Sequence, residues 1–186
     1  MKTTISFLTQ DETKRLFAAI KNKRDRAIFL TAYRHGLRAS EIGMLQRTDV
    51  NLKSGRLTIQ HTKGSLSGIY AMQPDEIKAL RAYVATRADS SPYLFISNRT
   101  LPISRFTLLK LMQTYAEAAA IPKEKRKFHA LKHSIATHLL DAGADLSFVK
   151  DWLGHANIQN TTIYAQLTST ARDQQARPFS ASHRVV

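Results

Sequence analysis

Residues 128–164 read FHALKHSIATHLLDAGADLSFVKDWLGHANIQNTTIY, and this stretch decides most of the expected fold. Its apolar residues recur at helical spacing, and Gly143 and Gly154 interrupt that spacing where a helix would end. The helices expected here are residues 129–142, 145–152 and 157–164. The stretch is also rich in imidazoles and ends on a tyrosine, so it contains several candidates for catalytic residues.

The same periodicity predicts further helices upstream. Thr9 and Glu12 have the spacing of a capping box. Gly36 should end the second helix, and Pro74 suits the first turn of a later one. The expected spans are 10–21, 25–35, a short helix from 40, a helix after 74, 104–119 and a polar helix at 168–177.

Between the helices the period changes to two. Leu57, Ile59 and His61 alternate with polar residues, which is typical of a strand. Residues 67–72 fit a return strand, with a turn at 62–65. With no internal repeat, the sequence predicts one domain that is mainly α with a small antiparallel β-sheet, an α+β fold.

The composition indicates a polyanionic partner. The chain has 186 residues, with 28 Lys and Arg against 14 Asp and Glu, a formal net charge of +14. Nucleic acid is the commonest such partner, although charge alone leaves open a ribosome-like or merely soluble basic protein. The absence of cysteine excludes disulfides, Cys-ligated zinc and thiol catalysis. No apolar run is long enough to span a membrane, so we expect a cytoplasmic protein, associated with a bacterial nucleoid.

One basic loop stands out. It follows Pro122 and precedes a helical pattern, and it contains Lys123, Lys125, Arg126 and Lys127. A solvated connector would have this composition, but with the net charge we expect it to contact a DNA backbone.

Four groups of residues could carry chemistry. Arg38 follows a glycine turn at a helix start, where it could reach outward or simply pair with Glu41. Lys63 lies at the expected hairpin tip and could be a general acid, a phosphate contact or a solvated turn residue. His129 and Lys132 are three residues apart and should share a helix face. His129 and His133 also share that face, but a zinc site needs a third ligand and no acid is placed as in HExxH, so we do not expect a metal site.

The fourth group is His155, in Leu-Gly-His, with Tyr164 nine residues later. A phenol is a poor nucleophile unless cations stabilise it and the transition state. Cations and imidazoles around a phosphodiester could neutralise the charge that develops on phosphorus while a tyrosine attacks. Such a reaction needs no metal or other cofactor.

Together these residues resemble the catalytic domain of the tyrosine recombinases, the phage integrase family. The resemblance covers residues 9–170 and implies that fold. It implies that Arg38, Lys63, His129, Lys132, His155 and Tyr164 are catalytic, with Glu41 in support. It further implies a site-specific recombinase or integrase that cleaves and rejoins double-stranded DNA through a 3′-phosphotyrosyl intermediate, as a tetramer on DNA.

Lys132 departs from the family pattern, which has a second arginine there. Lysine keeps the charge but loses the bidentate fork. The alternative to an active enzyme is therefore a catalytically weakened DNA-binding module at recombination sites, and strand relaxation of the type IB topoisomerase kind is a third reading. His133, one residue further, should point to another side of the helix and is not expected to replace the arginine.

The ends of the chain give further expectations. About nine residues precede the first helix, so we expect a short N-terminal extension at 1–8 without the family's N-terminal DNA-binding domain. The chain would then be a separate catalytic domain, or similar to short recombinases such as the fimbrial phase-switch invertases. The tail at 171–186 is expected to dock on a neighbouring protomer.

Overall fold

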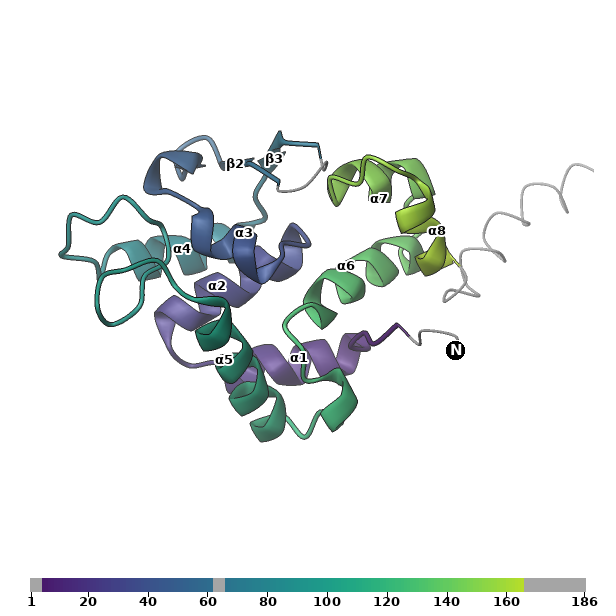
Figure 1. Ribbon diagram of the computed structural model, residues 1–186, viewed down its shortest axis with the longest axis horizontal. Helices are drawn as coiled ribbons and strands as arrows, with labels where there is room; N and C mark the ends of the chain where they lie inside the picture. The colour runs from purple at the N-terminus through teal and green to yellow at the C-terminus, as the bar shows by residue number, and fades with distance from the viewer. Residues whose placement is uncertain (1–4, 62–65, 166–186) are drawn as a thin grey trace, which may run out of the picture.

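The computed structural model describes residues 5–61 and 66–165, and its ribbon is mainly helical with a small sheet at one edge (Figure 1). Its elements are α1 (Gln10–Ala19), α2 (Lys23–Arg34), α3 (Ala39–Met44), η1 (Arg47–Asp49), β1 (Val50–Asn51), β2 (Arg56–Ile59), β3 (Gly68–Ala71), α4 (Pro74–Val84), α5 (Arg105–Ala118), η2 (Lys123–Lys125), α6 (Ala130–Asp141), α7 (Leu146–Trp152) and α8 (Gln159–Ala165). The predicted fold class is confirmed. The polar helix expected at 168–177 lies outside the described residues.

Side-chain caps set where several helices begin. The Thr9 hydroxyl accepts from the backbone of Glu12, whose carboxylate accepts from the Thr9 backbone at 2.7 Å, so the predicted capping box is confirmed. Asp145 caps α7 in a similar way, through Phe148. Such caps satisfy amide groups that have no partner within the helix. The first helix ends two residues before its expected limit, because Ile20 is already extended, at φ −85° and ψ 103°.

The sheet is antiparallel in the order β1-β2-β3. Leu57 pairs with Tyr70 and Ile59 with Gly68, and the alternating Leu57 and Ile59 are buried as the sequence predicted. The two-residue strand β1 was not predicted, because two residues are too few to show an alternating pattern. The expected turn at 62–65 lies outside the described residues.

Helix α2 forms the centre of the core, packed against α4 and α6 (Figure 1). Phe29 is fully buried and meets Tyr115 and Phe128 edge to face, at ring-centroid distances of 5.8 and 5.5 Å. Burial of one such side chain stabilises the fold by about 2–3 kcal/mol. The core therefore joins α2 to α5 and to the segment that leads into α6.

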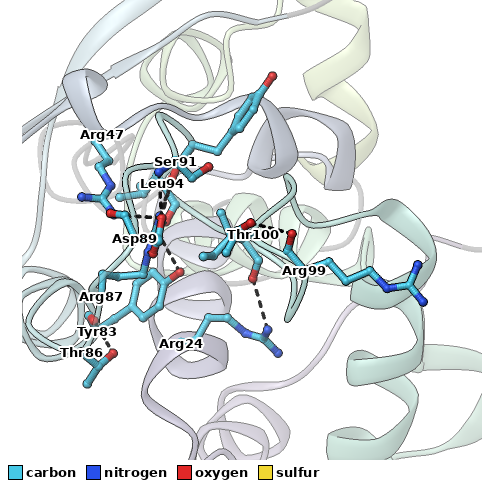
Figure 2. Close-up of polar contacts among 12 residues, drawn as sticks. Arg24, Arg47, Tyr83, Thr86, Arg87, Asp89, Ser91, Leu94, Arg99 and Thr100 are labelled. Carbon is cyan, nitrogen blue, oxygen red and sulfur yellow. Dashed lines mark hydrogen bonds and ion pairs between the residues drawn. The ribbon is translucent and has the colours of Figure 1, made fainter.

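The connection between α4 and α5 has no helix but is closely tied down (Figure 2). Arg87 is bound to the Asp89 carboxylate, and its Nη1 donates to the Tyr83 hydroxyl at 3.1 Å and to the Leu94 carbonyl at 2.6 Å. Arg47 donates to the Asp89 carbonyl at 2.9 Å. These arginines serve the fold, so part of the positive charge is unavailable to a partner.

Helix α7 is anchored to the end of α2. Trp152 Nε1 donates to the Arg34 carbonyl at 2.8 Å, and its ring stacks on His35 with centroids 5.7 Å apart. His35 is itself buried against Glu76 of α4, at 3.0 Å. The turn that follows Trp152 is thereby held beside the start of α3.

Candidate active site

Arg38 lies where α2 turns into α3. Gly36 makes this turn at φ +59°, and a Cβ there would lie 2.4 Å from Cδ2 of Leu153. Arg38 is the N-cap of α3, and Glu41 accepts from both the Arg38 backbone at 2.7 Å and Nη1 at 2.9 Å. The expected pairing of Arg38 with Glu41 is present. Because 36% of the arginine side chain stays exposed, the guanidinium can also meet a ligand.

Glu41 also contacts an imidazole that the sequence did not single out as a site residue. His61 Nδ1 lies 3.0 Å from Oε1 of Glu41, and both side chains are buried. Burial alone would raise the pKa of Glu41, but the hydrogen bonds from His61 and from the Arg38 backbone lower this pKa to about 2. The carboxylate therefore stays ionised and fixes both neighbours.

His61 packs against the turn after α7. A Cβ on Gly154, whose φ is +65°, would lie 2.4 Å from Cδ2 and 2.6 Å from Nε2 of His61. The Leu66 amide donates to the Gly154 carbonyl at 2.9 Å. Only glycine allows so close an approach in this conformation. The sheet and the Leu-Gly-His turn therefore meet at this point, whereas Lys63 lies outside the described residues.

Lys132 of α6 points into the protein. It is 1% exposed, and its Nζ donates to the Leu153 carbonyl at 3.1 Å. Burial lowers the pKa of Lys132 to about 8, with a further contribution from the positive charge of Arg38. A carbonyl at the end of α7 favours a cation, so this contact joins α6 to the Leu-Gly-His turn.

His155 is buried beside the same turn. Its Nδ1 lies 2.9 Å from the Thr161 hydroxyl, which orients the ring. Burial lowers the pKa of His155 to about 4, and the charges of Lys132 and Arg38 lower it further. The imidazole is therefore neutral at pH 7, when it can act as a hydrogen-bond donor rather than as a charge.

Tyr164 of α8 is the proposed nucleophile, and its side chain is buried. It is 2% exposed, and its hydroxyl lies 2.8 Å from Nδ1 of His133. Burial raises the pKa of Tyr164 to about 12, although Arg38 acts in the opposite direction. His133 also meets the His129 ring edge to face, with centroids 4.4 Å apart. Helical spacing predicts that His129 and His133 share a face of α6, but the contact with Tyr164 of α8 depends on tertiary packing and could not be predicted from spacing.

The structure brings these groups together from segments far apart in sequence. The charge of Arg38 lowers the pKa values of Lys132, His129, His155 and Tyr164, which places all four within its electrostatic range. A cleft of about 430 Å³ runs beside His129 and His133. Lys127, His129 and His133 line this cleft, whereas Arg38, Lys132 and His155 do not. Cations and imidazoles gathered in one region suit an anion whose charge grows during reaction.

The basic loop divides into two kinds of residue. Lys125 Nζ is paired with Glu12 at 2.8 Å, and Arg126 donates to the Ile121 carbonyl at 2.8 Å and pairs with Glu117 at 3.0 Å. Lys123 and Lys127 are exposed and form no ion pair within residues 5–61 and 66–165. Lys127 also borders the cleft beside His129.

Comparison with known proteins decides the family. The model of the phage integrase family matches residues 6–170. The chain belongs to the phage integrase family. It is 34% identical over 165 residues to tyrosine recombinase XerA of Pyrococcus horikoshii, a match that covers 87% of this chain and 57% of that protein. It is 30% identical to the type 1 fimbriae regulatory protein FimE of Escherichia coli, covering 85% of this chain and 84% of FimE.

Solved structures agree with this family membership. The crystal structure of XerA recombinase superposes with a TM-score of 0.82 at 29% identity, over 96% of this chain and 65% of that one. The XerH site-specific recombinase bound to a palindromic difH substrate, in a post-cleavage complex, has the same fold, with a TM-score of 0.78 at 20% identity, over 95% of this chain and 54% of that one. This phage integrase family chain thus has the fold of tyrosine recombinase catalytic domains. It spans under three fifths of the length of the XerA relative.

Residues 5–61 and 66–165 contain neither a membrane-spanning helix nor a cluster of metal ligands. In residues 5–61 and 66–165 of this phage integrase family member, no helix has the length and hydropathy required to cross a bilayer. The same residues contain no group of three or more acidic or imidazole side chains placed to hold a metal ion.

Proposed function

We propose that this chain is the catalytic domain of a site-specific DNA recombinase, which cleaves and rejoins double-stranded DNA through a 3′-phosphotyrosyl link to Tyr164. The observation that carries the proposal is the position of the Tyr164 phenol, buried on His133 and within the electrostatic range of Arg38. XerA, which aligns over 87% of the chain, is named a tyrosine recombinase. The reaction conserves the phosphodiester energy and uses neither metal nor ATP.

Each side chain has a role in this proposal. Arg38, held by Glu41, binds a non-bridging oxygen of the scissile phosphate and stabilises its growing charge. His129 and the neutral His155 donate hydrogen bonds to the same phosphate. Lys63 protonates the leaving 5′ oxygen, so that the alkoxide does not have to leave with its charge.

Lys132 decides between the two forms of the proposal. Its ammonium lies within the electrostatic range of Arg38, yet it is hydrogen-bonded to the Leu153 carbonyl. In an active enzyme the Lys132 ammonium would bind the phosphate, either in place of the Leu153 carbonyl or together with it. The alternative function is a weakened DNA-binding module, which is favoured if the ammonium stays with Leu153.

The assembly belongs to the proposal as well. Residues 9–170 would form the catalytic domain, with 1–8 as an extension and 171–186 docking on a neighbouring protomer of a tetramer on DNA. Lys123 and Lys127 would contact the DNA backbone, with Lys127 at the border of the cleft. Lys125 and Arg126 would support the loop through Glu12 and Glu117. The protein would act in the cytoplasm, on the bacterial nucleoid.

A covalent trap tests this function. A pool of nicked duplexes with a randomised core loses the short strand after attack, so that cleaved DNA stays on the protein and can be sequenced. We expect adducts on one family of sequences with the wild type and none with Tyr164→Phe, although both proteins bind DNA equally. Equal adduct from Tyr164→Phe would contradict the nucleophile assignment. Adduct from Lys132→Arg alone would favour the binding module, and relaxation of any supercoiled plasmid would favour a topoisomerase.

A further inference from the structure

His133, the first imidazole within α6, lies closer to the proposed reaction than its place in the sequence suggests. Its Nδ1 is 2.8 Å from the Tyr164 hydroxyl. Among the described residues, that nitrogen is the one hydrogen-bond partner found for the phenol. The two rings are tilted by 51°, with centroids 5.6 Å apart, so the contact is a hydrogen bond rather than a stack.

The direction of this hydrogen bond follows from burial. Tyr164 is 2% exposed, so a hydroxyl proton that pointed away from His133 would be a buried donor without a partner. Burial lowers the pKa of His133 to about 4, helped by His129 and Lys132, and raises that of Tyr164 to about 12. The shared proton therefore rests on the oxygen, and the phenol donates to an unprotonated Nδ1.

We infer that His133 is the group that accepts the Tyr164 proton when the tyrosine attacks the phosphate, an inference that rests on the proposed function. As the Oη–P bond forms and the bond from phosphorus to the 5′ oxygen breaks, the phenolic proton moves to Nδ1. The leaving 5′ oxygen takes a different proton, from Lys63. Rejoining reverses both transfers: the incoming 5′ hydroxyl returns its proton to Lys63, and Tyr164 leaves with the proton of His133.

The neighbours of His133 explain why DNA is needed for the transfer. The positive charge of Lys132, and that of His129 when it is protonated, disfavour a positive charge on His133 in the free protein. A phosphate anion in the cleft compensates these charges, and an opposite charge nearby raises the basicity of an imidazole. The base would therefore become effective once the scissile phosphate is in place.

His129 faces the same cleft but has a different relation to the nucleophile. It is the N-cap residue of α6 and meets the edge of the His133 ring, with the centroids 4.4 Å apart. Within the described residues it has no hydrogen bond to Tyr164. His129 can reach a phosphate in the cleft, which leaves the proton transfer to His133.

Two variants and one substitution of the nucleophile test the inference. In His133→Asn the amide oxygen takes the place of Nδ1, so the variant can hold the phenol but cannot carry its proton. We expect this variant to form the covalent adduct about 100-fold or more slowly, with unchanged DNA affinity and unfolding temperature. Replacing Tyr164 by a fluorinated tyrosine, which ionises nearer neutral pH, should restore most of this loss in His133→Asn and none of the loss in His129→Asn.

The possible outcomes separate the inference from the proposed function. Adduct formation by His133→Asn within about threefold of the wild type, or rescue of His129→Asn instead, would overturn the role of His133 alone. No adduct with the wild-type chain would overturn the proposed function, and the inference with it. A second readout needs no DNA: ¹⁵N NMR of the full chain should show an unprotonated Nδ1 at neutral pH, whereas an Nδ1–H tautomer would overturn the inference.

Discussion

The ammonium of Lys132 donates to the carbonyl of Leu153 at 3.1 Å, at the point where α7 ends. The family pattern has arginine at this position, and a guanidinium would present a planar fork instead of a point charge. The lysine is buried beside Arg38, so its charge is easier to lose than that of an exposed lysine. The departure from the expected arginine can therefore be tested through the pKa of Lys132.

The first prediction concerns pH. Because the pKa of Lys132 is lowered to about 8, its ammonium is lost as the pH rises through 8. The rate of adduct formation at subsaturating DNA, which reports the free protein, should therefore fall above pH 8 in the wild type. In Lys132→Arg it should persist to higher pH, because a guanidinium stays charged. Identical profiles for the two proteins would show that this lysine does not contribute its charge.

The second prediction concerns Glu41. Glu41→Gln leaves the buried His61 and the half-buried Arg38 without a carboxylate, so unfolding should require about 1–3 kcal/mol less free energy at pH 7. The folded pKa of Glu41 is depressed to about 2, so its contribution is present above the unfolded value of 4.5 and is lost as the pH falls toward 2. Urea melts should therefore show the gap between the variant and the wild type closing between pH 5 and pH 2.

Glu117→Gln is the matched control for Glu41. Glu117 pairs with Arg126, but its side chain is 75% exposed, so the variant should lie within about 0.5 kcal/mol of the wild type at every pH. A loss as large as that of Glu41→Gln would mean that burial is not the cause of the Glu41 effect.

The third prediction concerns Gly154. In Gly154→Ala the new Cβ overlaps the His61 ring and comes within 2.9 Å of the Leu66 carbonyl oxygen, at φ +65°. We expect a loss of about 3 kcal/mol or more in urea unfolding, from backbone strain and overpacking together. Gly55→Ala has the same strain, at φ +66°, but meets only Ile77 at 3.3 Å, so it should lose about 1–2 kcal/mol. Equal losses would exclude the overlap as a cause.

The fourth prediction separates the two kinds of lysine in the basic loop. Lys127→Met should weaken binding to any duplex and reduce the salt slope of the association constant by about 1, without loss of stability. Lys125→Met should leave the slope unchanged but destabilise the fold, because Glu12 loses its partner. Fluorescence anisotropy over a salt series measures the slopes. A reduced slope for Lys125→Met alone would reverse the assignment.

Much of the fold could be predicted from local pattern. Helix positions follow from apolar spacing, and the caps at Thr9 and Asp145 follow from residue type, because both depend on neighbours within four residues. The two-residue strand β1 and the ordered connection around Arg87 were not predictable. Two residues are too few to show an alternating pattern, and the connection is held by a contact between residues distant in sequence, Arg47 and Asp89.

The sequence by itself determined which residues we propose for the chemistry: spacing, side-chain reactivity and the resemblance to the tyrosine recombinases point to Arg38, His129, Lys132, His155 and Tyr164. Only the tertiary structure decided the surroundings of each side chain. It buried Lys132 on a carbonyl, and it placed His61 on Glu41 and His133 on Tyr164. The physical reason is that pKa and hydrogen bonding depend on what lies within a few ångströms in space, and α6 and α8 become neighbours only after folding.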